Sequence, residues 1–322
     1  MAHHHHHGKH HGKHHHHDAD HGTGHPCMDG PEGNAASHAE LLDLDARVLG
    51  PYLDEVTRWA AQYAPTDPRI VVDMGAGTGT GTVALAERFT RAEVVAVDVS
   101  ESMLDRVQAA AAEHGIADRV RLLQADLDAG WPQAGAADVV WAASSLHEVA
   151  SPDRVLADVY AALNPGGLLV VLEMDSLPRF LPDDVETARP GLETRCHEAL
   201  AQQGWNAHPN WRSHLEQAGF TVAAERSFVA ESGENPKADE VAHPGAMAAT
   251  GTAAKEGPPS SATSRYADGY LRRMRPALDG QLDPQDLNAL DRVLATDSDE
   301  SLLRRDDLKV RVARTAWAAR RA

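Results

Sequence analysis

Short apolar runs recur through the middle of the chain, and segments with apolar residues at helical spacing separate them. Short apolar runs bounded by turn residues predict buried strands, whereas apolar positions three and four residues apart predict helices. The predicted strands are a run that ends at Asp73 and residues 93–97, 119–124, 137–141, 168–173 and 220–229. Because strands and helices alternate, we expect a parallel sheet with crossover helices, which is a doubly wound α/β fold.

Two helices are predicted before the first strand, over residues 39–48 and 51–63. Gly50 is expected to end the first, and Pro51 suits the first turn of the second because its missing N–H has no partner there. The second helix carries aromatic residues at helical spacing. They could line the entrance of a ligand site, but large aromatic residues on one helix face are more often core, which is the interpretation we favour.

The segment after the fifth strand predicts a helix from about residue 184 to 203 and another that opens at residues 208–211 and ends at Gly219. Residues 232–263 lack periodicity, so this stretch is expected to be a disordered loop or a mobile lid. Two or three helices follow. Residues 308–320 then alternate like a strand.

A glycine-rich turn follows the first strand, with Asp73 two places before Gly75 and further glycines at positions 77 and 79. Glycine lets the backbone approach a ligand closely, and the helix behind the turn offers unpaired N–H groups. In the dinucleotide fingerprint GxGxxG a phosphate occupies this place. A carboxylate beside the turn suits a ligand with an ammonium group better. NAD or a flavin remains the alternative ligand.

Further polar residues follow the ends of the next strands. Asp98 ends the second strand, where an acid can hold a ribose diol through paired hydrogen bonds. Asp126 follows the third strand and could accept a hydrogen bond from an exocyclic amine. His147 and Glu148 follow the fourth. Since the carboxyl ends of parallel strands meet at one edge of a sheet, we expect these residues to surround one ligand.

With these elements in this order, residues from about 40 to 230 resemble the class I S-adenosylmethionine (SAM)-dependent methyltransferases, and more narrowly the group that includes the quinone-biosynthesis type. The motifs that carry the resemblance are Asp73-x-Gly-x-Gly-x-Gly79, Asp98, Ala125-Asp126, Ser145-Leu-His147-Glu148 and Leu163-Asn-Pro-Gly-Gly-Leu168. The resemblance implies that the glycine turn and the first acid hold the methionine part of SAM. It also implies that the second acid holds the ribose and that the third region flanks the adenine.

Carried over by position, the implied SAM-binding residues are Asp73, Gly75, Gly77, Thr78, Gly79, Asp98, Met103, Ala125, Asp126, Leu127 and Ala143. The resemblance also implies an antiparallel seventh strand, for which residues 310–318 fit, and a helical insertion before it that covers the substrate. The expected organisation is a disordered head, a SAM-binding core with its cap helices, a loop with a helical insertion that could form a lid, and the last strand, at residues 1–36, 37–231, 232–307 and 308–322.

The net charge and the number of cysteines limit the partners and the cellular compartment that we expect. The chain of 322 residues has a formal net charge of −18, and a nucleic acid partner would need a basic face. Only two cysteines are present and no CxxC pair, as expected for a reducing cytoplasm. No apolar stretch approaches the roughly 20 residues of a membrane span. The first residues are His-rich rather than basic and then apolar, so they do not predict a secretory signal.

The His-rich head could bind metal. Its histidines are interrupted by Gly-Lys pairs and include His3, His4, His5, His6, His7, His10, His11, His14, His15, His16 and His17. Neutral imidazoles on a flexible chain bind Ni²⁺, Zn²⁺ or Cu²⁺. An affinity tag is usually one unbroken run, so the interrupted pattern favours a native metal-binding head over a tag. Low-complexity drift without a use is the third interpretation.

Methyl transfer from SAM needs alignment and, for many acceptors, a base that removes a proton. His147 is the first candidate, since its ordinary pKa lies near neutral pH, and Glu148 is the second. A purely structural hydrogen bond of His147 is equally compatible with the sequence. Glu173 and Asp175 come next because they lie at a strand end. Weaker candidates for the substrate wall are His197, His208 and Trp211.

The function that these observations favour is methyl transfer from SAM to an O, N or C atom of a small molecule. One alternative is a SAM-fold protein that stores or senses metal through its head. Another is a methyltransferase that acts on a protein or RNA, which the net acidity disfavours in the case of RNA.

Overall fold

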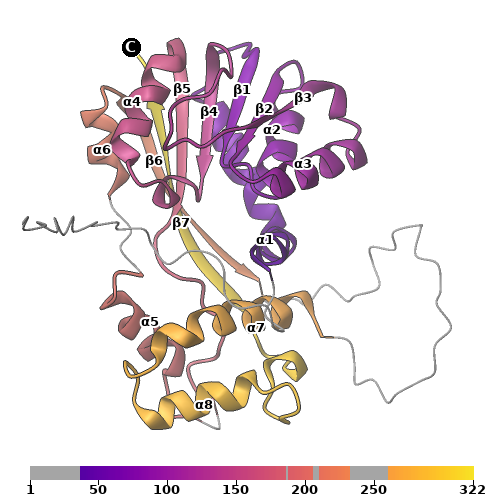
Figure 1. Ribbon diagram of the computed structural model, residues 1–322, viewed down its shortest axis with the longest axis vertical. Helices are drawn as coiled ribbons and strands as arrows, with labels where there is room; N and C mark the ends of the chain where they lie inside the picture. The colour runs from indigo at the N-terminus through magenta and orange to yellow at the C-terminus, as the bar shows by residue number, and fades with distance from the viewer. Residues whose placement is uncertain (1–36, 186–187, 206–209, 233–259) are drawn as a thin grey trace, which may run out of the picture.

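A computed structural model describes residues 37–185, 188–205, 210–232 and 260–322 (Figure 1). Its centre is one seven-stranded sheet in the order β3-β2-β1-β4-β5-β7-β6. The strands are β1 (Ile70–Met74), β2 (Glu93–Asp98), β3 (Val120–Gln124), β4 (Ala137–Ala143), β5 (Leu163–Met174), β6 (Thr221–Ser232) and β7 (Val310–Arg320). β1 to β5 pair in parallel, and β7 is antiparallel to both β5 and β6. The expected doubly wound, mostly parallel sheet with an antiparallel last strand is confirmed.

Eight α-helices accompany the sheet in the described part of the chain: α1 (His38–Ala61), α2 (Thr80–Arg88), α3 (Glu101–Glu113), α4 (Pro152–Ala162), α5 (Leu192–Ala201), α6 (Trp211–Gln217), α7 (Ala262–Met274) and α8 (Pro284–Leu294). Polar side chains cap several of them. Ser100 accepts from the backbone N–H of Met103 at the start of α3, and Asp283 accepts from that of Gln285 at the start of α8. None of these helices is long and apolar enough to cross a membrane.

The prediction of two helices before the first strand is wrong, because α1 runs through Gly50 and Pro51 without a break. Its two halves are buried in different places. Leu41, Leu44 and Val48 belong to an apolar cluster shared with α5, α7 and α8, whereas Tyr52 and Trp59 pack against the sheet. Burial of both halves offsets the low helix propensity of glycine and proline in the middle. The aromatic residues of this helix are core, as the sequence favoured.

α5 is also shorter than predicted, since it begins at Leu192 rather than near residue 184. Gly191 precedes it with a φ of 78°, a left-handed conformation that glycine adopts without cost, and Pro190 stands before that. A proline at this point cannot lie inside a helix without removing a hydrogen bond. Residues 188–191 therefore precede α5 without helical structure.

α5, α7 and α8 form a helical lobe below the carboxyl ends of the parallel strands (Figure 1). One apolar cluster joins them with the first half of α1 and with Val310 and Val312 of β7. The helices between β6 and β7 are the predicted insertion, and the packing adds α5 to the same lobe. α1 therefore packs against both the helical lobe and the sheet. The glycine turn, which approaches Leu42 of α1, lies near the boundary between the lobe and the sheet.

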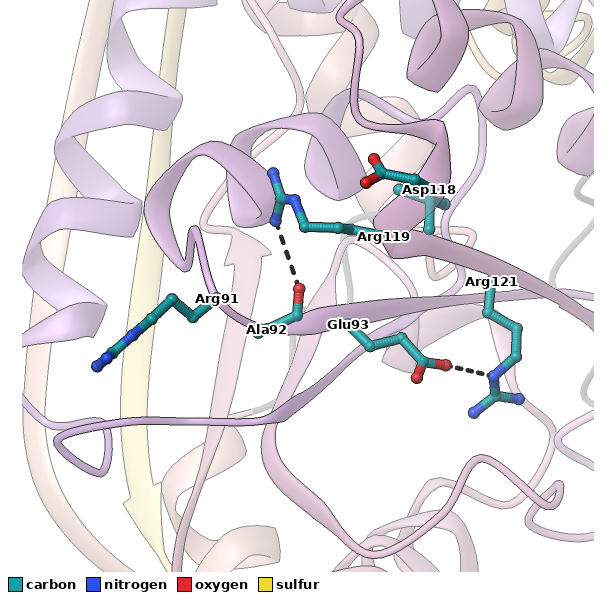
Figure 2. Close-up of a pocket in the computed structure, with 7 residues that line it drawn as sticks. Arg91, Ala92, Glu93, Asp118, Arg119 and Arg121 are labelled. Carbon is teal, nitrogen blue, oxygen red and sulfur yellow. Dashed lines mark hydrogen bonds and ion pairs between the residues drawn. The ribbon is translucent and has the colours of Figure 1, made fainter.

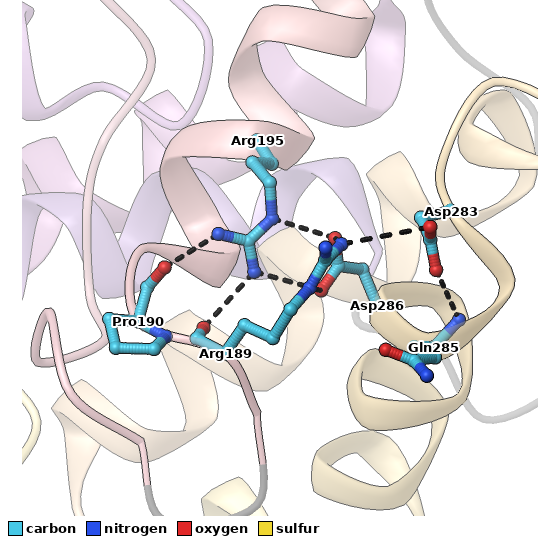
Figure 3. Close-up of polar contacts among 6 residues, drawn as sticks. All are labelled: Arg189, Pro190, Arg195, Asp283, Gln285 and Asp286. Atoms are coloured by element: carbon cyan, nitrogen blue, oxygen red, sulfur yellow. Dashed lines mark hydrogen bonds and ion pairs between the residues drawn. The ribbon is translucent and has the colours of Figure 1, made fainter.

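A buried carboxylate fastens the lobe together (Figure 3). The side chain of Asp286 in α8 is only 2% exposed, and it accepts hydrogen bonds from Arg189 at 2.6 Å and from Arg195 of α5 at 2.6 Å and 2.8 Å. Both guanidinium groups hold the pKa of Asp286 below its ordinary value. A paired buried charge of this kind fixes the relative position of two elements. The bonds to Asp286 therefore fix the position of α8 relative to α5 within the lobe.

Candidate active site

The glycine turn lies between β1 and α2 and touches three other elements. Its three glycines have φ values of 73°, 53° and 93°, a region that other residues rarely adopt. A Cβ at Gly75 would lie 2.6 Å from the Cβ of Ser145, and one at Gly79 would lie 2.9 Å from the Cα of Val107. A Cβ at Gly77 would lie 3.2 Å from Leu42 of α1. The turn therefore fits closely between α1, α3 and the loop after β4.

Asp98 connects this turn to the start of α3. One carboxylate oxygen accepts from the backbone N–H of Gly77 at 2.9 Å, and the other accepts from that of Ser100 at 2.9 Å. The side chain is half-buried. Each carboxylate oxygen has two lone pairs, so these bonds leave acceptor capacity for a ligand. The predicted ribose-binding acid thus lies directly against the glycine turn.

Asp73 lies beneath the turn and is fully enclosed. Its carboxylate accepts from the hydroxyl of Thr82 in α2 at 2.6 Å, and the residue is 2% exposed. Burial raises the pKa of Asp73 to about 6, against the lowering effect of the Thr82 bond. An acid in this position holds the turn and α2 together. A direct contact with an ammonium group stays a prediction.

Replacing Asp73 by Asn is expected to stabilise the protein above pH 6. The folded chain binds more protons at this site than the unfolded chain between pH 3.8 and about 6, so the wild type loses stability as pH rises through that window. Asn can still accept from Thr82 and carries no buried charge. We expect a gain of about 2 kcal/mol in the free energy of unfolding at pH 8 and none at pH 3.5. Urea titrations at both values would show it, and equal stability at pH 8 would contradict the buried charge.

His147 lies between two carboxylates in a short 3₁₀ helix (Leu146–Glu148) after β4. Its Nδ1 is 2.7 Å from Glu173 and its Nε2 is 3.1 Å from Glu148. Glu173 is 3% exposed and also accepts from the backbone N–H groups of Ser145 and Leu146. Ser144 has a φ of 49°, which is the one positive value for a non-glycine residue in the described ranges. Backbone strain of this kind often accompanies functional loops.

The two carboxylates determine the charge of His147. Burial works against its protonation, but the bonds to Glu148 and Glu173 outweigh it and raise the pKa of His147 to about 10. At neutral pH the ring is therefore a cation that donates from both nitrogens. A proton must leave before His147 can act as a base, so the base role stays a prediction, and the alternative of a positioning hydrogen bond gains a geometric basis.

The remaining predicted residues lie around the same strand ends. Asp126 is exposed, and one of its oxygens accepts from the backbone N–H of Asp128 at 2.8 Å. The N–H of Ala125 donates to the backbone oxygen of Asp98 at 3.0 Å, so the ends of β2 and β3 are adjacent. Intermediate or buried positions are held by Thr78, Met103, Leu127 and Ala143.

The weaker candidates from the sequence lie in different parts of the chain. Asp175 is exposed and accepts from Ser227 at 3.1 Å, on the side of β6 and β7. His197 lies on α5 in the helical lobe, where burial lowers its pKa to about 4. Trp211, the first residue of α6, is 2% exposed and packs in the apolar cluster of the sheet, so it is a core residue. His208 lies outside the described residues.

The sequence did not point to three residues at this site. Val99 follows Asp98 and is 64% exposed, which is unusual for a large apolar residue. The sequence carries a local signal for Val99, because this apolar residue stands between Asp98 and Ser100, the N-cap of α3. His38 of α1 and Arg273 of α7 lie 3.2 Å apart, His38 Nδ1 to Arg273 Nη1, and His38 is within electrostatic reach of Asp98 and of the His147 loop. No sequence signal links residues so far apart.

A separate cavity of about 270 Å³ lies at the opposite edge of the sheet, where β2 and β3 begin (Figure 2). Its arginines are occupied by the protein itself. Arg119 donates to the backbone oxygens of Ala86 and Ala92, and Arg121 donates to Glu93. In open α/β sheets ligands bind at the carboxyl ends of strands, so we place the candidate site at the glycine turn and not in this cavity.

The described residues contain no group of three His, Cys, Asp or Glu side chains that could hold a metal ion. The His-rich head, with all its predicted metal ligands, lies outside the described residues.

Comparison with known proteins finds similarity to methyltransferases over part of the chain. The methyltransferase domain family matches residues 71–167, which run from β1 into the first part of β5. The chain is 34% identical over 140 residues to trans-aconitate 2-methyltransferase of Variovorax paradoxus (strain S110), covering 42% of this chain and 52% of that protein. It is 37% identical over 113 residues to demethylmenaquinone methyltransferase of Thermus thermophilus, covering 35% of this chain and 50% of that protein. The chain thus spans about half the length of the curated relatives that it matches.

Among solved structures, the [4+2]-cyclase SpnF is 16% identical, covers 88% of this chain and 93% of that chain, and has a TM-score of 0.46. A likeness at this level carries no argument about function. The matched segment and the order of the seven strands agree with the expected resemblance to the class I SAM-dependent methyltransferases, and the match covers part of the chain.

Proposed function

We propose that this chain, as a class I SAM-dependent methyltransferase, transfers a methyl group from SAM to an O, N or C atom of a small molecule. The observation that carries the proposal is the position of Asp98. Its carboxylate touches the glycine turn through Gly77 and the start of α3 through Ser100, with Val99 exposed beside it. An acid that can accept from a diol, a turn without side chains and an exposed apolar residue together suit an adenosyl ligand.

The residues fit the cofactor as follows. Asp98 would hold the ribose, Val99 and Asp126 would flank the adenine, and the backbone of the glycine turn would take the methionine part. When bound, SAM supplies a methyl group on a positively charged sulfonium, which an acceptor displaces in line. Asp73 would act beneath the turn by fixing its shape through Thr82.

The chain's own residues would supply alignment, exclusion of water and charge. α1 lies across the glycine turn through Leu42, and the helical lobe faces the strand ends. Glu173 holds the loop after β4 in place through two backbone N–H groups and His147. His147 and Glu148 are the residues proposed to handle any proton that the acceptor loses.

The test is a turnover assay that detects S-adenosylhomocysteine, run beside calorimetry with SAM. We expect SAM to bind with one site per chain and S-adenosylhomocysteine to accumulate only when an acceptor is present. The acceptor panel should include trans-aconitate and demethylmenaquinone, the substrates in the names of the relatives. A protein that binds no SAM would contradict the proposal. SAM binding without turnover on small molecules would favour the alternatives of a protein or RNA substrate or of a metal-related role.

We further propose a reducing, cytoplasmic setting. Cys196 is a buried free thiol, and burial raises its pKa to about 12, so it is not a reactive group.

The net charge of −18 makes an extended nucleic acid contact unfavourable.

The His-rich head is expected to bind Ni²⁺, Zn²⁺ or Cu²⁺ independently of methyl transfer. A chain that begins at Ser37 should lose the binding of several metal equivalents and keep SAM affinity, because the turn and its acids lie downstream. Metal competes with protons for imidazole, so affinity should fall steeply between pH 7 and about pH 5.5. Metal titration of both chains is the measurement. Loss of SAM binding on truncation would show that the head belongs to the active site.

A further inference from the structure

The helix α1 has a weak point near its middle, where Gly50 and Pro51 lie inside an unbroken helix. Glycine is among the least favourable residues of a helix interior, and proline lacks the N–H that would bond to the backbone oxygen of the fourth residue before it. Gly50 is exposed, its φ is not positive, and a Cβ there would meet nothing within 4 Å. Neither packing nor backbone conformation therefore requires a glycine at this position.

The weak point coincides with a change of packing partner along α1. Before it, Leu44 and Val48 pack in the apolar cluster that α1 shares with the helical lobe. After it, Tyr52 and Trp59 pack against the sheet. A bend at Gly50 would therefore let the first half of α1 move with the lobe while the second half stays on the sheet.

The first half of α1 lies across the candidate site. A Cβ at Gly77 of the glycine turn would be 3.2 Å from Leu42, so this leucine lies close to the turn. The next residue, Asp43, forms an ion pair with Arg106 of α3 at 2.9 Å, and both side chains are half-exposed. The first half of α1 is thus joined to α3, beyond the glycine turn, by an ion pair that water and salt can reach.

We propose that residues 38–49 form a strap over the SAM site, hinged at Gly50, and that the ion pair between Asp43 and Arg106 is a latch through which ionic strength sets the rate of cofactor exchange. An exposed ion pair is weak and is screened by salt, so it suits a contact that must open in every catalytic cycle. The inference rests on the proposed methyltransferase function, because the exchanging ligands are SAM and S-adenosylhomocysteine.

The links of Asp45 are compatible with this motion. Its carboxylate accepts from Arg314 of β7 at 2.7 Å and from the hydroxyl of Tyr266 in α7 at 2.8 Å. With a rise of about 1.5 Å per residue, Asp45 lies about 8 Å from Gly50 along the helix, whereas His38 lies about 18 Å away. A bend at Gly50 displaces Asp45 less than half as far as His38. The links near the hinge can therefore persist while the first turns of α1 leave the glycine turn.

The latch is tested by Arg106→Gln. Stopped-flow fluorescence of the full-length protein gives the association and dissociation rates of SAM at about 0.02 M and about 0.5 M NaCl. At low salt we expect both rates to be about twofold to fivefold faster than in the wild type with SAM affinity unchanged, and at high salt we expect the difference to disappear. The control is Arg226→Gln, which removes a half-exposed ion pair to Glu55 in the second half of the same helix and should keep the wild-type rates.

Asp43→Asn separates the latch from electrostatic attraction of the cofactor. It removes the opposite charge, so an effect on attraction would have the opposite sign to that of Arg106→Gln, whereas loss of the latch accelerates exchange in both variants. The hinge is tested by Gly50→Ala, which favours the straight helix. Both rates should fall about fourfold with SAM affinity unchanged, and Gly50→Ser should lie between alanine and glycine, in the order of helix propensity.

Equal change of both rates is the result that a purely structural role would not give, since damage to the site changes affinity. Thermal unfolding of each variant checks that the fold is intact. The strap is overturned if Arg106→Gln and Asp43→Asn exchange SAM like the wild type at low salt, or if Gly50→Ala leaves both rates unchanged. It is also overturned if the variants change SAM affinity through one rate alone. Failure of the proposed function is distinct, because the wild type itself would then bind no SAM.

Discussion

Replacing Asp98 by Ala is expected to weaken SAM binding by tenfold or more. Hydrogen bonds to a charged group are worth about 1.5–3 kcal/mol each, and about 1.4 kcal/mol corresponds to a factor of ten. The change removes the proposed ribose acceptor. It also removes the acceptor of the Gly77 and Ser100 backbone N–H groups, so the turn itself loses support. Calorimetry with SAM measures the effect, and Asp98→Asn, which keeps the volume and one acceptor oxygen, should lose less affinity.

Gly77→Val should abolish SAM binding for a different reason. The φ of 53° is strained for a β-branched residue, and a Cβ would already lie 3.2 Å from Leu42. The control is Gly115→Val, because Gly115 has a φ of 66° and a Cβ there would meet nothing within 4 Å. That variant carries the same backbone cost and should keep SAM affinity. If Asp98→Ala and Gly77→Val both bind SAM like the wild type, the assignment of the cofactor site is wrong.

Replacing His147 by Ala is expected to reduce turnover by about 10²-fold while SAM affinity changes much less. The reason is its place in the loop after β4, where its ring joins Glu148 to the buried Glu173. His114→Ala is the control, since His114 also pairs with a glutamate, Glu87, but on the exposed surface. Steady-state rates and SAM calorimetry on the two variants separate a catalytic effect from a binding effect. A loss of SAM affinity that accounts for the whole effect would indicate a structural role.

The pH dependence separates the two roles that His147 can play. Its pKa is raised to about 10, so a base that must first lose this proton predicts a turnover rate that climbs with pH toward 10. A positioning cation predicts a rate that falls as pH passes 10. Stability gives a further readout. The paired imidazolium stabilises the fold fully below pH 6.5, and this contribution is lost as pH rises to about 10. The decline in the free energy of unfolding should be absent in His147→Ala.

Local sequence signals determined the core of this protein. The alternation of apolar runs and helical segments predicted the parallel sheet, because burial on both faces requires continuous apolar strands. The glycine turn and Asp98 could be recognised without coordinates, because a strand, a turn and a helix follow each other directly along the chain. The caps at Ser100 and Asp283 are equally local, since each side chain accepts from a backbone N–H only three or two residues further along the chain.

Tertiary contacts decided the rest. α1 is one helix through Gly50 and Pro51 because the lobe buries its first half and the sheet buries its second half. A stretch of ten residues in the sequence shows neither of these contacts. The charge of His147 depends on Glu173, which is 26 residues away in the sequence but 2.7 Å away in the fold. His38 and Arg273 meet across 235 residues. A sequence states which groups can carry charge, but only the packing sets their distances and their exposure to water, and these determine pKa and chemistry.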